Sequence, residues 1–123
     1  MTNNLFPRNL LQSFKYALHG LFCVIKSQPN MRIHLYLATG VILSGALLGL
    51  AAIEIAILSC VIVFVLITEV INTALEFSLD FANGKRFDPS IKIVKDIVAG
   101  VVLIASINAV IVGCIIFIPH LSL

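Results

Sequence analysis

Three long stretches without Lys, Arg, Asp or Glu constrain the fold of this chain more than any other feature. They cover residues 33–53, 55–68 and 97–118. About 20 apolar residues in a helix suffice to cross the hydrocarbon core of a membrane. The second stretch is shorter, but its helical pattern continues through polar residues to position 80. We therefore predict an all-α membrane protein with membrane helices over 33–53, 55–80 and 97–118, and a turn at Glu54.

The composition excludes several other classes of protein. The 123 residues are 60% hydrophobic and 11% charged, whereas a soluble domain carries about 25% charged residues. A small soluble domain has a large surface for its volume, and so few charges cannot cover it. A soluble globular domain, a disordered chain and a nucleic-acid binder with a basic face are all excluded.

Residues 8–27 show the periodicity of an amphipathic helix. The apolar side chains recur on one helical face: Leu10, Phe14, Ala17, Leu18, Leu21 and Ile25. The polar side chains recur on another face: Arg8, Gln12, Lys15, His19 and Lys26. A basic amphipathic helix of this kind lies in the membrane interface and does not span it. Pro29 ends the segment, because a proline disfavours helical backbone in the residue before it.

The placement of Lys and Arg predicts the orientation in the membrane. Four of the eight precede residue 33, and the other four are Lys85, Arg86, Lys92 and Lys95. Cytoplasmic segments carry the excess of positive charge, so the N-terminus and residues 81–96 are expected on the cytoplasmic side. We predict a loop over 81–96, because this segment contains Asn-Gly, Asp-Pro and most of the remaining charge.

Polar residues form one stripe on the second predicted span. Glu69, Asn72, Glu76 and Asp80 stand at i, i+3, i+7 and i+11, within about 80° of one another on a helix. Ionisable residues inside a membrane are costly and usually functional. A divalent metal and the basic residues of 81–96 would offset their repulsion. Glu69 lies about 16 Å along the helix from Asp80, which suits a reaction between a soluble substrate and a lipid headgroup.

Other interpretations of these residues stay open at this point. The acids could form interhelical hydrogen bonds or reach the interface. A proton or cation relay would need an acid or histidine further along the path, where the other spans offer Thr39, Ser44, Ser106 and Asn108. Lys95 and Asp96 could be an ordinary cytoplasmic lysine and a helix-start aspartate. We predict that the histidines, at positions 19, 34 and 120, are isolated interfacial residues.

The run Glu69-Val-Ile-Asn72-Thr-Ala-Leu-Glu76-Phe-Ser-Leu-Asp80, followed by Lys95-Asp96-Ile-Val-Ala-Gly, resembles the signature of the prokaryotic diacylglycerol kinase family. That family includes the undecaprenol kinases. The resemblance covers residues 1–123 as one domain and implies a homotrimeric helical bundle in the bacterial cytoplasmic membrane, with active sites shared between subunits. It implies Mg²⁺-dependent transfer of the ATP γ-phosphate to a lipid alcohol. Residues 30–34 are more similar to the undecaprenol kinase branch, and the acceptor, undecaprenol or diacylglycerol, stays open.

The resemblance also implies roles for individual residues. Glu69 would be the general base, and Asn72 would orient the base or the substrate. Glu76 would hold Mg²⁺ on the nucleotide phosphates. The remaining residues implied at the nucleotide site are Asp80, Asp96, Tyr16 and Lys95, of which Lys95 would neutralise the β- and γ-phosphates.

One position departs from the family pattern. The family usually has a glutamate on the surface helix that binds metal together with the Glu76 position, and this chain has Gln28 there. A glutamine carbonyl can still bind Mg²⁺ but brings no charge, so metal affinity should fall. We expect retained activity, because the other implied residues are present. The alternative is a catalytically weakened paralogue that binds lipid or nucleotide.

Overall fold

The computed structural model describes residues 9–121, and its regular structure there is four helices. They are α1 (Leu10–Ser27), α2 (Pro29–Leu47), α3 (Ala52–Asn83) and α4 (Pro89–Leu121). The prediction of an all-α fold with an N-terminal amphipathic helix is confirmed. Residue 8, where we expected the first helix to begin, lies outside the described range.

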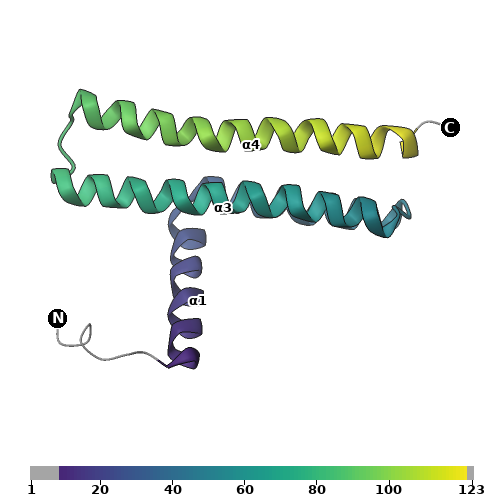
Figure 1. The fold of residues 1–123 in the computed structure, drawn as a ribbon, viewed down its shortest axis with the longest axis horizontal. Helices are drawn as coiled ribbons and strands as arrows, with labels where there is room; N and C mark the ends of the chain where they lie inside the picture. The colour runs from purple at the N-terminus through teal and green to yellow at the C-terminus, as the bar shows by residue number, and fades with distance from the viewer. Residues whose placement is uncertain (1–8, 122–123) are drawn as a thin grey trace.

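The long helices α3 and α4 run antiparallel and side by side, and α1 lies crosswise to them (Figure 1). α2 packs against α3 and lies behind it in this view. The 32 residues of α3 extend about 48 Å, well beyond the ~30 Å hydrocarbon core of a membrane. If α3 crosses a membrane, a part of the helix must extend beyond the hydrocarbon core. That part of α3 can carry polar residues.

Two helices of the described chain, α3 and α4, are long and apolar enough to cross a membrane. α2 has 19 residues, about 28 Å of helix, and contains Arg32 and His34 near its start. α2 is not among the described helices that are long and apolar enough to cross a membrane. A third span over 33–53 therefore stays a prediction.

The junction between α1 and α2 follows the proline rule. Gln28 is extended, with φ −114° and ψ 109°, and Pro29 occupies the first turn of α2. Arg32 then reaches back over the junction, and its Nη1 donates to the carbonyl oxygens of Ile25 at 2.9 Å and Lys26 at 2.8 Å. These bonds satisfy carbonyls at the end of α1 and fix the direction in which α2 leaves it.

The connection between α2 and α3 lies earlier than we predicted. α2 ends at Leu47, and Gly49 adopts a left-handed backbone with φ 72°. Residues 48–53 carry no charge, so hydropathy gave no sign of a helix end inside the apolar stretch. Glu54 is not in the turn but in the first turn of α3, where its Oε1 accepts a hydrogen bond from the backbone N–H of Ala51 at 2.9 Å.

The predicted loop over 81–96 is wrong in its extent. α3 continues to Asn83 and α4 begins at Pro89, so the connection covers residues 84–88. Gly84 ends α3 with φ 63°, and Asp88 Oδ1 accepts from the N–H of Ser90 at 2.8 Å at the start of α4. The concentration of charge in 81–96 marks where the helices leave the apolar region, not where they end.

Candidate functional site

The carboxylate of Glu69 is buried on α3. Its neighbours on the same helix, Thr68, Asn72 and Thr73, are the other buried polar residues of the described chain. Thr73 Oγ1 donates to the backbone carbonyl of Glu69 at 2.9 Å. This hydroxyl is therefore hydrogen-bonded to the backbone and not to the Glu69 carboxylate. The structure therefore places a nearly inaccessible acid inside the apolar part of α3.

Asn72 and Glu76 form the next step of the stripe. Asn72 Nδ2 donates to Glu76 Oε1 at 3.4 Å. Asn72 Oδ1 is buried and has no hydrogen-bond partner in the described part of the chain. A buried acceptor without a partner costs about 1–3 kcal/mol, and such an atom in a native structure is often satisfied by a water, an ion or a ligand.

Asp80 and Lys95 link α3 to α4 at the polar end of the stripe. Lys95 Nζ donates to Asp80 Oδ1, and both side chains are about one-third exposed. The structure thus brings Lys95 to the stripe, as its proposed role requires. Asp96 points elsewhere, because one residue along a helix is a rotation of about 100°. It pairs instead with Lys92, at 2.7 Å between Nζ and Oδ2, and both side chains are exposed.

The sequence also suggested Tyr16, on α1, and Gln28, the residue between α1 and α2. Within the described residues, the Gln28 side chain makes no hydrogen bond to the stripe. Gln28 is half-buried, and its backbone N–H donates to Val24 O at 2.9 Å. Tyr16 is exposed on α1. Within residues 9–121 no group of three or more His, Cys, Asp or Glu side chains could hold a metal ion. A metal site shared by Gln28 and Glu76 stays a prediction.

Two histidines are not isolated, and the prediction that they were is wrong. His34 Nε2 lies 3.9 Å from Glu69 Oε2. His120 Nε2 lies 3.1 Å from Glu54 Oε2, which joins the end of α4 to the start of α3. Each pair bridges two helices, so spacing along the sequence could not reveal it. The available signal was the position of His34 at the start of an apolar stretch, where a polar ring needs a partner.

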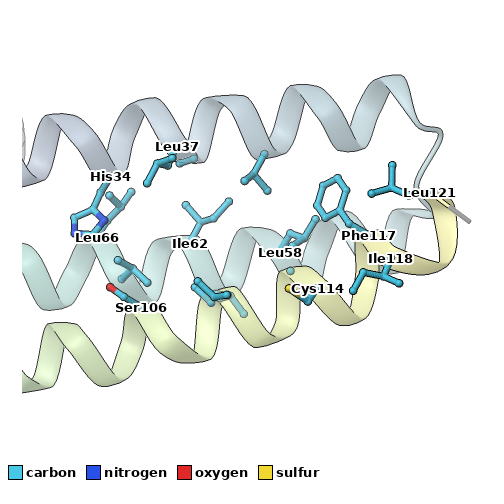
Figure 2. Close-up of a pocket in the computed structure, with 17 residues that line it drawn as sticks. His34, Leu37, Leu58, Ile62, Leu66, Ser106, Cys114, Phe117, Ile118 and Leu121 are labelled. Atoms are coloured by element: carbon cyan, nitrogen blue, oxygen red, sulfur yellow. The ribbon is translucent and has the colours of Figure 1, made fainter.

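An apolar groove of about 510 Å³ runs between α2, α3 and α4. His34, Leu66 and Ser106 lie at one end, and Phe117 and Leu121 lie at the other (Figure 2). The lining between these ends is almost entirely apolar. Because His34 is also the neighbour of Glu69, the groove begins beside the buried carboxylate.

Sequence comparisons relate this chain to known proteins. Residues 15–117 match the family model described as prokaryotic diacylglycerol kinase. A "Diacylglycerol kinase" of Synechocystis sp. is 45% identical over 116 residues, which cover 94% of this chain and 66% of that protein. An "Undecaprenol kinase" of Bacillus subtilis is 32% identical over 110 residues, 89% of either chain. The chain thus spans slightly less than two thirds of the cyanobacterial relative and most of the Bacillus one.

Proposed function

Because the chain belongs to the prokaryotic diacylglycerol kinase family, we propose that it is a membrane lipid kinase that transfers the γ-phosphate of ATP to a lipid alcohol, undecaprenol or diacylglycerol. The observation that carries this proposal is the polar stripe of α3. Its buried end holds the Glu69 carboxylate, and its exposed end holds the Asp80–Lys95 pair. A lipid hydroxyl can reach the buried end, while a water-soluble nucleotide can reach the other.

Glu69 acts as the general base in this proposal. As the lipid O–H bond breaks, Glu69 takes the proton and the lipid oxygen forms a bond to the γ-phosphorus. The bond from that phosphorus to the β–γ bridging oxygen breaks, and ADP leaves. Asn72 lies one turn further along the same face of α3 and orients the base or the incoming hydroxyl. Positioning and charge neutralisation supply most of the rate enhancement in phosphoryl transfer.

The residues present fit Mg²⁺ as the accompanying metal. Glu76 supplies a carboxylate, and Asn72 Oδ1 is a buried oxygen without a partner in the described chain. Mg²⁺ prefers oxygen ligands and usually binds through one or two carboxylates together with substrate phosphates. Gln28 would add a carbonyl oxygen without charge. When bound, the ion neutralises charge on the phosphate oxygens.

Lys95, Asp80, Asp96 and Tyr16 make up the proposed nucleotide side of the site. Lys95 exchanges its contact with Asp80 for the β- and γ-phosphates, where an ammonium acts as a point charge. A partly exposed ion pair is worth about 0–1 kcal/mol, so this exchange costs little. The Asp96 side chain is exposed beside Lys92, and Tyr16 is exposed on α1.

We place the protein in the bacterial cytoplasmic membrane as a homotrimer, with the N-terminus and the active site on the cytoplasmic side. The exposed large apolar side chains along α3 and α4 support contact with lipid and with other subunits.

The groove between α2, α3 and α4 takes the hydrocarbon chain of the acceptor in this proposal. Its lining is apolar, and its polar end lies beside Glu69 through His34. An acceptor chain in the groove would hold its hydroxyl near the base. Such positioning can remove several kcal/mol from a barrier.

The experiment that tests the proposal supplies purified protein with radiolabelled ATP and with undecaprenol and diacylglycerol in parallel. We expect labelled lipid phosphate from at least one of them, dependent on Mg²⁺. Absence of labelled lipid over a titration of Mg²⁺ and Mn²⁺ would contradict the proposal. If Gln28→Glu then restored turnover, the chain would be a weakened paralogue.

A further inference from the structure

His34 stands next to the carboxylate that the proposed reaction uses as its base. Its Nε2 lies 3.9 Å from Glu69 Oε2, with side-chain exposures of 21% and 3%. Within the described residues, His34 is the one basic side chain within 4.0 Å of the Glu69 carboxylate. Glu69 lies on α3 and His34 on α2, so the arrangement of two helices creates this contact.

Two features of α2 anchor the backbone beside His34. Arg32 is bonded to the two carbonyls at the end of α1, and Met31 is buried. His34 follows within the next turn and therefore starts from a fixed stretch of backbone. Because Met31 is buried and Arg32 is hydrogen-bonded, the backbone that carries His34 is fixed where α2 begins.

His34 also lines the polar end of the groove, where Figure 2 shows its ring directed in among the lining side chains. An acceptor whose chain occupies the groove would bring its hydroxyl to this end. The ring thus lies between the route of the acceptor and the base.

We infer that His34 is a positioning residue for Glu69: its ring N–H engages one carboxylate oxygen and leaves the other directed at the acceptor hydroxyl. This inference rests on the proposed function, because it gives Glu69 the part of the base. A distance of 3.9 Å is longer than a hydrogen bond. Catalytic hydrogen bonds are often long before the substrate binds, and we expect this one to shorten with lipid in the groove.

Kinetics of three variants test the inference. His34→Ala should lower kcat by about tenfold or more while KM for ATP stays unchanged. His34→Gln should recover most of that loss, because the amide N–H can donate to the same oxygen. His19→Ala, on the exposed surface of α1, is the matched control and should behave as wild type. Unchanged kcat in His34→Ala, or equal losses in the Ala and Gln variants, would overturn the inference.

A second readout does not depend on turnover. The chain has three histidines, so nitrogen NMR of the imidazole rings can resolve His34 in the full-length protein in detergent. The His34 ring resonances should move in Glu69→Gln, while those of His19 and His120 should not. Unmoved His34 resonances would overturn the inference whatever the activity. If the His34 resonances moved in Glu69→Gln but the wild-type protein phosphorylated neither lipid, the pairing would be supported and only the lipid kinase proposal would be overturned.

Discussion

Lys95 at the start of α4 donates a hydrogen bond to Asp80 near the end of α3, and this contact closes the polar end of the stripe that begins at Glu69. Both side chains are about one-third exposed, so the pair itself stabilises the fold by about 1 kcal/mol or less. Its importance lies in placing a cation beside a row of carboxylates, at the end of α3 that extends beyond the apolar part of the helix.

Lys95→Met should therefore damage the reaction much more than the fold. An ammonium bound to phosphate is worth roughly 1.5–3 kcal/mol. In the wild type, part of this free energy is spent on breaking the contact between Lys95 and Asp80. We therefore expect KM for ATP to rise by about tenfold in the variant. Thermal unfolding in detergent should change little. Lys85→Met removes the same charge in the connection between α3 and α4, outside the proposed site, and serves as the control. If both variants raised KM alike, the effect would come from general positive charge.

Glu69→Gln should lower turnover by orders of magnitude and keep the fold. Loss of a general base lowers the rate by about 10²- to 10⁴-fold, and an uncharged amide is easier to bury than a carboxylate. We expect kcat to fall within that range and the melting temperature to stay equal or rise. Labelled lipid phosphate and thermal unfolding measure the two effects.

Glu54→Gln is the matched control for this change. It makes the same substitution on the same helix and keeps a carbonyl that can accept from Ala51, as Glu54 Oε1 does. It should leave kcat near wild type. A Glu69→Gln protein with more than a tenth of wild-type kcat would exclude Glu69 as the base.

The sequence predicted the elements that depend on local physics. Pro29 after Gln28 predicted the α1–α2 junction, and the 3.6-residue period predicted that Glu69, Asn72, Glu76 and Asp80 share one face. The end of α2 was missed, because Gly49 lies inside an apolar stretch in which nothing else marks a turn. Helix ends are set by backbone conformation as well as by hydropathy.

Contacts between helices could not be predicted from the sequence in this way. The pairing of His34 with Glu69 depends on how α2 packs against α3. The pairing of His120 with Glu54 depends on α4 running the full length of α3. No spacing rule relates residues that lie 35 or 66 positions apart, so these contacts emerge only with the tertiary arrangement.

Gln28→Glu should lower the Mg²⁺ concentration needed for half-maximal activity. An added carboxylate supplies both charge and an oxygen ligand, and ligand charge tunes the affinity of oxygen sites for divalent ions over orders of magnitude. We expect a shift on the order of tenfold, measured as activity against free Mg²⁺ at saturating ATP and lipid.

Gln12→Glu gives the matched charge change on α1, at its other end. Gln12 Oε1 accepts from the backbone N–H of Asn9 at 3.1 Å, and a glutamate can keep that bond. Its Mg²⁺ dependence should equal that of wild type. Equal shifts in both variants would mean that general negative charge near the membrane attracts Mg²⁺ and that position 28 holds no ligand.

Gly113→Leu should weaken binding of the lipid acceptor without affecting ATP. Gly113 lines the groove, and apart from its chain neighbours and the backbone of its own helix no atom lies within 4 Å of where a Cβ would stand. A leucine can therefore extend from α4 without a clash of its Cβ and occupy part of the groove, while helix propensity improves. We expect KM for the lipid to rise by about 10-fold or more, since a misfit of one or two methylenes costs roughly 1–3 kcal/mol.

Gly40→Leu makes the same change on α2, at a position that is equally open and outside the groove lining, and should leave both KM values unchanged. An unaltered lipid KM in Gly113→Leu would place the acceptor chain elsewhere on the protein.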